Sequence, residues 1–116
     1  LSSNSLMGKL PSTISNLKNL KVLSLFDNSL LGTIPASIGE LTNLEELVLS
    51  NNAFYGNLPG ELAQLTNLRT LLLSNNAFKG NYAMLKDKFP NIVDFDLDEA
   101  NMKGALATLD SEDHDD

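Results

Sequence analysis

Apolar residues recur in this chain at a fixed spacing of 24 residues. Stretches that begin at Leu20, Leu44 and Leu68 each have leucine at their first, fourth and sixth positions and asparagine at their ninth. The fourth and sixth positions, such as Leu47 and Leu49, are two residues apart, which places both side chains on one face of a β-strand. A period of this length predicts a stack of short units whose leucines form one continuous core.

Asparagine and glycine are expected to shape the bend after each strand. The short amide of asparagine can bond backbone groups that the turn leaves unpaired, so it should end the strand. Glycine follows four residues later and permits a backbone conformation that is closed to other residues. The positions with these structural roles are Asn28, Asn52, Asn76, Gly32, Gly56 and Gly80.

A short helical turn is predicted in the second half of each unit. Pro35 suits a first helical position, because its missing N–H costs nothing there. Ile38 and Leu41 are three residues apart and should face the core together, and the pairs Ile14/Leu17 and Leu62/Leu65 repeat this spacing.

The pattern weakens toward the C-terminus. Residues 83–89 favour helix more strongly than their counterparts, which predicts a longer α-helix that Pro90 ends. In the last unit Ala100 occupies the asparagine position and Asn101 follows it. Residues 110–116 are mostly acidic and are expected to form a disordered tail.

The segment from Leu20 to Pro35 reads LKVLSLFDNSLLGTIP and resembles the plant-type leucine-rich repeat, L-x-x-L-x-L-x-x-N-x-L-x-G-x-I-P, at every fixed position. The resemblance covers residues 1–109, which we expect to form one domain that starts within a repeat and belongs to a longer array. It implies an α/β fold of about five 24-residue repeats. The implied fold is a right-handed, horseshoe-shaped solenoid with a concave parallel sheet and short 3-10 or α turns on the convex side.

The resemblance also implies that the variable strand positions bind partners. These side chains do not enter the core and should face the concave surface in columns. Val48 and Leu72 are expected to form a small apolar patch with Phe26 nearby, although scattered surface apolar residues are an alternative explanation. The proposed partner-binding residues are Val22, Ser24, Phe26, Glu46, Val48, Ser50, Thr70, Leu72, Ser74, Asp94, Asp96 and Asp98.

Charge and composition argue against several other functions. The net charge is −7, of which five acidic residues lie in the last seven, so the chain offers no basic surface for nucleic acid or anionic lipid. No apolar run is long enough to span a membrane. With no cysteine and one histidine, His114, we predict no metal, no cofactor and no catalytic residue.

Asp94, Asp96 and Asp98 alternate, so we expect them to share one face of the last strand. The pattern Asp-x-Asp-x-Asp also superficially matches a calcium loop. Glu99 stands where such a loop needs glycine, and Ala105 where it needs glutamate, so a solvated acidic end or a contact for a basic partner is the preferred interpretation.

The predicted function is recognition of a protein or peptide by the concave sheet, within a receptor-like signalling or defence protein and without enzyme activity. Alternatives are an intracellular scaffold, purely structural repeats, an inhibitor of a secreted polygalacturonase-like glycosidase, and an ice-binding solenoid. The resemblance favours the cell surface, whereas the lack of cysteine and of Asn-x-Ser/Thr sites is compatible with the cytoplasm. An open apolar end near Leu1 predicts stacking with further repeats or self-association.

Overall fold

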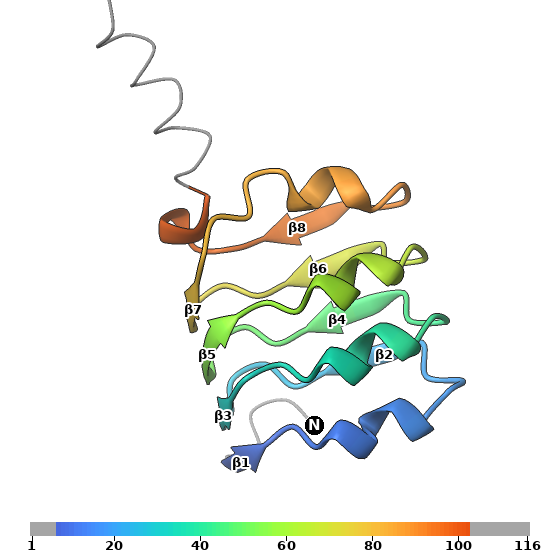
Figure 1. Ribbon diagram of the computed structural model, residues 1–116, viewed down its shortest axis with the longest axis horizontal. Helices are drawn as coiled ribbons and strands as arrows, with labels where there is room; N and C mark the ends of the chain where they lie inside the picture. The colour runs from blue at the N-terminus through green and yellow to red at the C-terminus, as the bar shows by residue number, and fades with distance from the viewer. Residues whose placement is uncertain (1–6, 103–116) are drawn as a thin grey trace, which may run out of the picture.

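The chain winds into stacked turns, and each turn adds one strand to each of two parallel sheets (Figure 1). This computed structural model describes residues 7–102. The inner sheet, as we call it, has the order β2 (Val22–Ser24), β4 (Glu46–Val48), β6 (Thr70–Leu72) and β8 (Asp94–Asp96). The outer sheet has the order β1 (Met7–Lys9), β3 (Ser29–Gly32), β5 (Ala53–Asn57) and β7 (Ala77–Lys79).

The inner sheet confirms the strand that the leucine spacing predicts, and its register is the 24-residue period itself. Leu23 pairs with Leu47, Leu47 with Leu71, and Leu71 with Phe95. The outer sheet is a finding that the sequence pattern did not predict. The predicted boundary at residue 109, the acidic tail and His114 lie outside the described residues.

Short 3-10 helices join each outer strand to the next inner strand. They are η1 (Ser12–Asn16), η2 (Ala36–Glu40), η3 (Gly60–Gln64) and η4 (Leu85–Lys88), and η5 (Glu99–Asn101) follows β8. The prolines were expected at the first position of each helix, but they precede the helix by one residue, at Pro11, Pro35 and Pro59. Each is an extended cap residue, and its carbonyl accepts the N–H of the residue three positions later. The residue before the helix therefore has its φ fixed by the proline ring.

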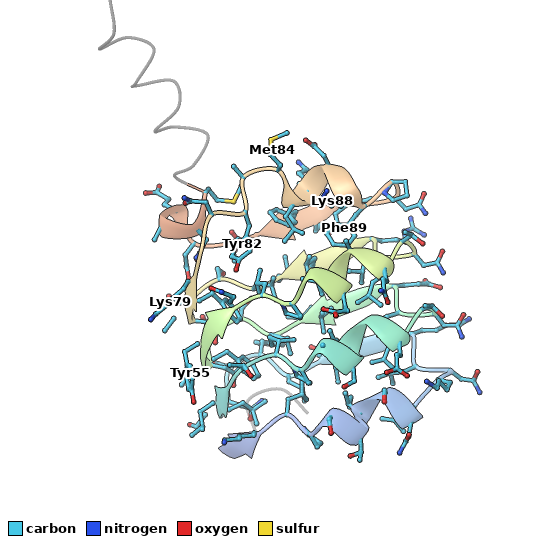
Figure 2. All side chains as sticks on the ribbon, in the orientation of Figure 1. Tyr55, Lys79, Tyr82, Met84, Lys88 and Phe89 are labelled. Atoms are coloured by element: carbon cyan, nitrogen blue, oxygen red, sulfur yellow. The ribbon has the colours of Figure 1, made fainter. Side chains whose placement is uncertain are left out.

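The prediction of a longer α-helix over residues 83–89 is wrong. The structure has only the four-residue η4 there, because the return to the next strand must place Leu85 and Phe89 against the core within the fixed repeat length. Phe89 is buried below η4, whereas Met84 points away from the stack (Figure 2). Packing has overridden the intrinsic helix propensity of this segment.

The core is a set of columns between the two sheets and the 3-10 helices. Leu47, Leu71, Leu41 and Leu65 are completely buried, and Phe54 stacks on a second phenylalanine, Phe78, at a centroid distance of 6.3 Å. The predicted inward position of Leu17 is not observed, since this side chain is 51% exposed. No turn among residues 7–102 packs against that side of η1.

An asparagine ladder holds the bends together, as the sequence predicts. The Asn52 side chain donates to the carbonyls of Leu25 (2.9 Å), Leu49 (3.1 Å) and Ser50 (3.2 Å), and its Oδ1 accepts the Leu30 N–H (3.1 Å). Asn76 makes the equivalent bonds one turn later, and Asn28 donates to the two carbonyls of its own turn. Asn52 and Asn76 therefore each satisfy backbone groups of two successive turns.

Left-handed backbone conformations occur at two fixed places in each bend. Gly56 has φ of +78°, and a side chain there would also meet the Thr33 Cγ2 atom at 2.9 Å, which explains the glycine requirement. The residue before each ladder asparagine is also left-handed, at Asp27, Asn51 and Asn75. Aspartate and asparagine tolerate this conformation better than other non-glycine residues.

The last turn departs from this plan at Glu99, which stands where the left-handed residue would be. Glutamate is less suited to that conformation, and the chain instead forms η5 from Glu99. Asn101 is displaced by one position, as predicted, and is 97% buried, since only 3% of it is exposed. Its amide donates to the Phe78 and Gly80 carbonyls (both 3.0 Å), so it covers the edge of β7.

Candidate recognition surface

The solvent-facing positions of the inner sheet form the columns that the sequence predicts. Strand pairing aligns Val22, Glu46, Thr70 and Asp94 in one row, and Ser24, Val48, Leu72 and Asp96 in the next. These side chains alternate with buried leucines in β2, β4 and β6 and with the half-buried Phe95 in β8, so they are exposed or half-buried. Phe26, Ser50 and Ser74 follow directly after the buried leucines that succeed the strands.

Apolar side chains are grouped on the first three strands of this face. Val48 and Leu72 are direct neighbours in the register, and both are half-buried. Val22 is 48% exposed and Phe26 is 38% exposed. We call Val22, Phe26, Val48 and Leu72 the apolar patch.

The carboxylates at the β8 end of the face have different surroundings. Asp94 and Asp96 are exposed, and the Ser74 hydroxyl donates to Asp96 Oδ2 at 2.8 Å. Asp98 is half-buried beyond the end of β8, and its carboxylate accepts the N–H groups of Asn75 (2.9 and 3.1 Å) and Asn76 (3.4 Å). The expectation that Asp98 shares the face of one strand with Asp94 and Asp96 is therefore wrong.

The role of Asp98 explains its orientation. In the two preceding turns, the N–H groups of Asp27 and Asn51 donate to the backbone carbonyls of Ser50 and Ser74. At Asn75 the next turn offers the Asp98 side chain as the acceptor, because the backbone has already turned into η5. Asp98 thus has a structural role, although the sequence pattern placed it among the partner-binding residues.

A polar pocket of about 300 Å³ borders the start of the inner strands, and Glu45, Asn67, Arg69 and Asn91 line it. The asparagines are tied to the preceding turn, since Asn67 donates to the Thr42 carbonyl (2.8 Å) and Asn91 to the Thr66 carbonyl (3.4 Å). The recurrence of asparagine every 24 residues at Asn19, Asn43, Asn67 and Asn91 was the available sequence signal for this second ladder.

Tyr82 is a further residue whose role the pattern did not reveal. It stands where earlier repeats have leucine or isoleucine, and its ring folds over Gly80 toward the preceding turn (Figure 2). The Leu58 N–H donates to its hydroxyl at 2.8 Å. The hydroxyl therefore links two turns by a bond that an aliphatic side chain could not make.

The described residues offer neither a metal site nor a membrane-spanning helix. Among residues 7–102, no three histidine, cysteine, aspartate or glutamate side chains come together in a way that could hold a metal ion. Within the same range, no helix has the length and apolar character needed to cross a membrane.

The repeats match a known family, and solved structures resemble most of the chain. The family model described as Leucine Rich Repeat matches residues 19–41 and 43–65. No curated protein sequence matches the chain. Solved structures, in contrast, match at identities of 31% to 40%.

Three solved structures illustrate the likeness. The ectodomain of the plant membrane receptor kinase GASSHO1/SCHENGEN3 from Arabidopsis thaliana, in complex with CASPARIAN STRIP INTEGRITY FACTOR 2, is 40% identical over 84% of this chain and 12% of its own, with a TM-score of 0.79. The Arabidopsis receptor kinase HAESA, in complex with the peptide hormone IDA and the co-receptor SERK1, is 36% identical over 84% of this chain and 16% of its own, with a TM-score of 0.79. A plant ice-binding protein is 35% identical over 79% of this chain and 30% of its own, with a TM-score of 0.73.

This chain thus spans less than a third of the length of each of these three proteins. The repeat pattern, the two sheets with their 3-10 turns and these similarities agree with one another. The chain is therefore a leucine-rich repeat chain of the plant type.

Proposed function

We propose that the inner sheet recognises a peptide or a protein segment, and that the chain serves this role within a receptor-like protein of signalling or defence. The observation that carries the proposal is the apolar patch, in which Val48 and Leu72 are registered neighbours on an otherwise polar sheet face. Apolar side chains within a polar rim are typical of recognition surfaces. The complexes of GASSHO1/SCHENGEN3 and HAESA with their ligands support the same function.

The size of the face suits a short segment. The four strands of the inner sheet span about 14 Å at ~4.8 Å per spacing, and five residues of each strand region extend for ~17 Å. The resulting area, on the order of 240 Å², is well below the ~800 Å² that each partner contributes to a standard protein interface. This chain would hold a short peptide, or contribute one part of a larger footprint.

The test is a selection of linear peptides from a random displayed library against the full chain, followed by anisotropy titrations of the best peptide. The double variant Val48→Glu, Leu72→Glu should weaken binding about tenfold or more, because it places charge in the centre of the contact. Both positions are half-buried rather than part of the core, and thermal unfolding measured in parallel shows whether the variant keeps its fold.

A matched control is available on the outer sheet. Leu31 and Tyr55 on the outer sheet are 40% and 48% exposed, and the variant Leu31→Glu, Tyr55→Glu adds the same charge there. Binding should survive in this control. Equal affinity for the wild type and the Val48/Leu72 variant would rule out the patch and favour purely structural repeats.

Ice binding is a second candidate, because one similar structure is a plant ice-binding protein. Ice recognition would need a regular array of small hydroxyl groups, whereas the central row of the inner sheet reads Ser24, Val48, Leu72 and Asp96. Measurement of thermal hysteresis decides this candidate, and we expect none.

A further inference from the structure

Charge is distributed unevenly over the inner sheet. Its twelve predicted partner-binding residues include four acidic residues and no lysine, arginine or histidine. The apolar patch occupies β2 to β6, and the exposed carboxylates of Asp94 and Asp96 follow on β8. Leu72 and Asp96 are registered neighbours, so an apolar contact and an exposed acidic group lie side by side.

Resting on the function proposed above, we infer that the inner sheet selects an extended peptide in which a bulky apolar residue and a lysine or arginine are two positions apart. The apolar side chain would contact Val48 and Leu72. The basic side chain would reach the carboxylates of Asp94 and Asp96. The ligand class is therefore a basic, apolar peptide rather than an acidic or purely apolar one.

The spacing of two positions follows from the geometry of the sheet. Adjacent strands lie about 4.8 Å apart, so the midpoint between Val48 and Leu72 is roughly 7 Å from Asp96. An extended peptide advances ~3.4 Å per residue, and side chains at i and i+2 point to the same side. Two residues of a peptide that crosses the strands therefore cover the distance from the apolar contact to the carboxylate.

The hydrogen bonds of the three aspartates determine which carboxylates can meet the ligand. Asp96 Oδ2 accepts the Ser74 hydroxyl, and its Oδ1 has no partner among residues 7–102. Asp98 is already bonded to the Asn75 and Asn76 N–H groups. Asp94 and Asp96 thus form the acidic contact, and Asp98 does not contribute.

Neighbouring charges favour an approach at the β8 end. Lys21 precedes β2 and Arg69 precedes β6, so a basic side chain would be repelled near those two strand starts, whereas Glu45 precedes β4 between them. The residue at the corresponding position before β8 is Val93, which is exposed and uncharged. The basic residue of the ligand therefore lies nearer to β8 than the apolar residue that contacts Val48 and Leu72.

In the experiment, the wild-type chain selects peptides from a random linear library. The affinity of each selected peptide is then measured for the wild type and for two charge variants. Asp94→Asn, Asp96→Asn keeps an amide acceptor for the Ser74 hydroxyl while it removes both charges. Glu61→Gln, Asp87→Asn is the matched control, since it removes two exposed charges from the region of η3 and η4. Thermal unfolding of all three proteins checks that the fold is kept.

We expect the selected peptides to be enriched in a bulky apolar residue and a lysine or arginine two positions apart. Loss of two exposed ion pairs should weaken binding between about 2-fold and about 30-fold in the Asp94/Asp96 variant and not in the control. Added salt should reduce the wild-type affinity and remove most of this difference.

Two other outcomes are distinguishable. Selected peptides that depend on Val48 and Leu72, but lack the basic residue or bind the Asp94/Asp96 variant equally, would overturn this inference and leave the proposed function intact. Failure to select any peptide, or binding that ignores the Val48/Leu72 variant, would overturn the proposed function and this inference with it.

Discussion

At the scale of single residues, asparagine and glycine do more to define this fold than any ion pair. Asn52 bonds backbone groups of two turns, whereas the Lys18–Glu40 pair joins two exposed side chains at 3.0 Å. Exposed pairs of this kind contribute little to stability. Unpaired backbone groups in a partly buried bend cost more, so the amide ladder has the larger effect.

Replacement of Asn52 by alanine should therefore lower the free energy of unfolding by about 2 to 4 kcal/mol, because several backbone groups lose their partners. Denaturant unfolding of the full chain measures this change. Asn57→Ala is the control, since Asn57 is exposed and its side chain has no bond among residues 7–102. Equal losses in the two variants would contradict the role of the ladder.

At the scale of elements, regular spacing makes some parts predictable and leaves others hidden. The inner strands follow from leucines two residues apart, and the bends follow from Asn52 and Gly56. The outer strands carry no uniform alternation, because Ser29–Gly32 has two adjacent leucines and ends in glycine. Their pairing arises from the stacking of turns, which a single repeat does not display.

The last turn shows a second limit of sequence reasoning. Alternation of Asp94, Asp96 and Asp98 indicated one acidic face, but Asp98 turns to the backbone of Asn75. That contact depends on the chain leaving the strand direction at η5, a consequence of Glu99 at the left-handed position. The apolar columns were predicted correctly because burial imposes them, whereas this polar contact depends on the detailed path of the bend.

The structural role of Asp98 predicts a local effect. Asp98→Ala should speed amide hydrogen exchange at Asn75 and Asn76, because these N–H groups lose their acceptor. Exchange measured by NMR reports both amides separately. Asp94→Ala is the control, and it should leave both rates unchanged; unchanged rates in Asp98→Ala would show that the carboxylate is dispensable.

At the scale of the whole molecule, the stack behaves as a row of turns in which each covers its neighbours. The turns in the middle are covered on both sides, so Leu41 is fully buried, whereas its counterpart 24 residues earlier, Leu17 at the first described turn, is half-exposed. Stability in such an array is approximately a sum of nearest-neighbour terms. Equivalent leucines therefore contribute unequally according to their place in the stack.

This difference can be measured with two leucine-to-alanine variants. Leu41→Ala should cost about 2 to 5 kcal/mol of unfolding free energy, because it leaves a cavity in the fully packed core. Leu17→Ala should cost less than about 1 kcal/mol, because roughly half of that side chain is already in contact with water. Similar costs in thermal or denaturant unfolding would contradict the account of the stack.

The most direct test of the central claim is to map where a selected peptide binds, by amide chemical-shift changes in the isotope-labelled full chain. If the inner sheet recognises the peptide, the largest changes should occur at Val48, Leu72 and Asp96, with little change at Leu31 and Tyr55 on the outer sheet. Changes concentrated on the outer sheet or on the 3-10 helices would contradict recognition by the inner sheet.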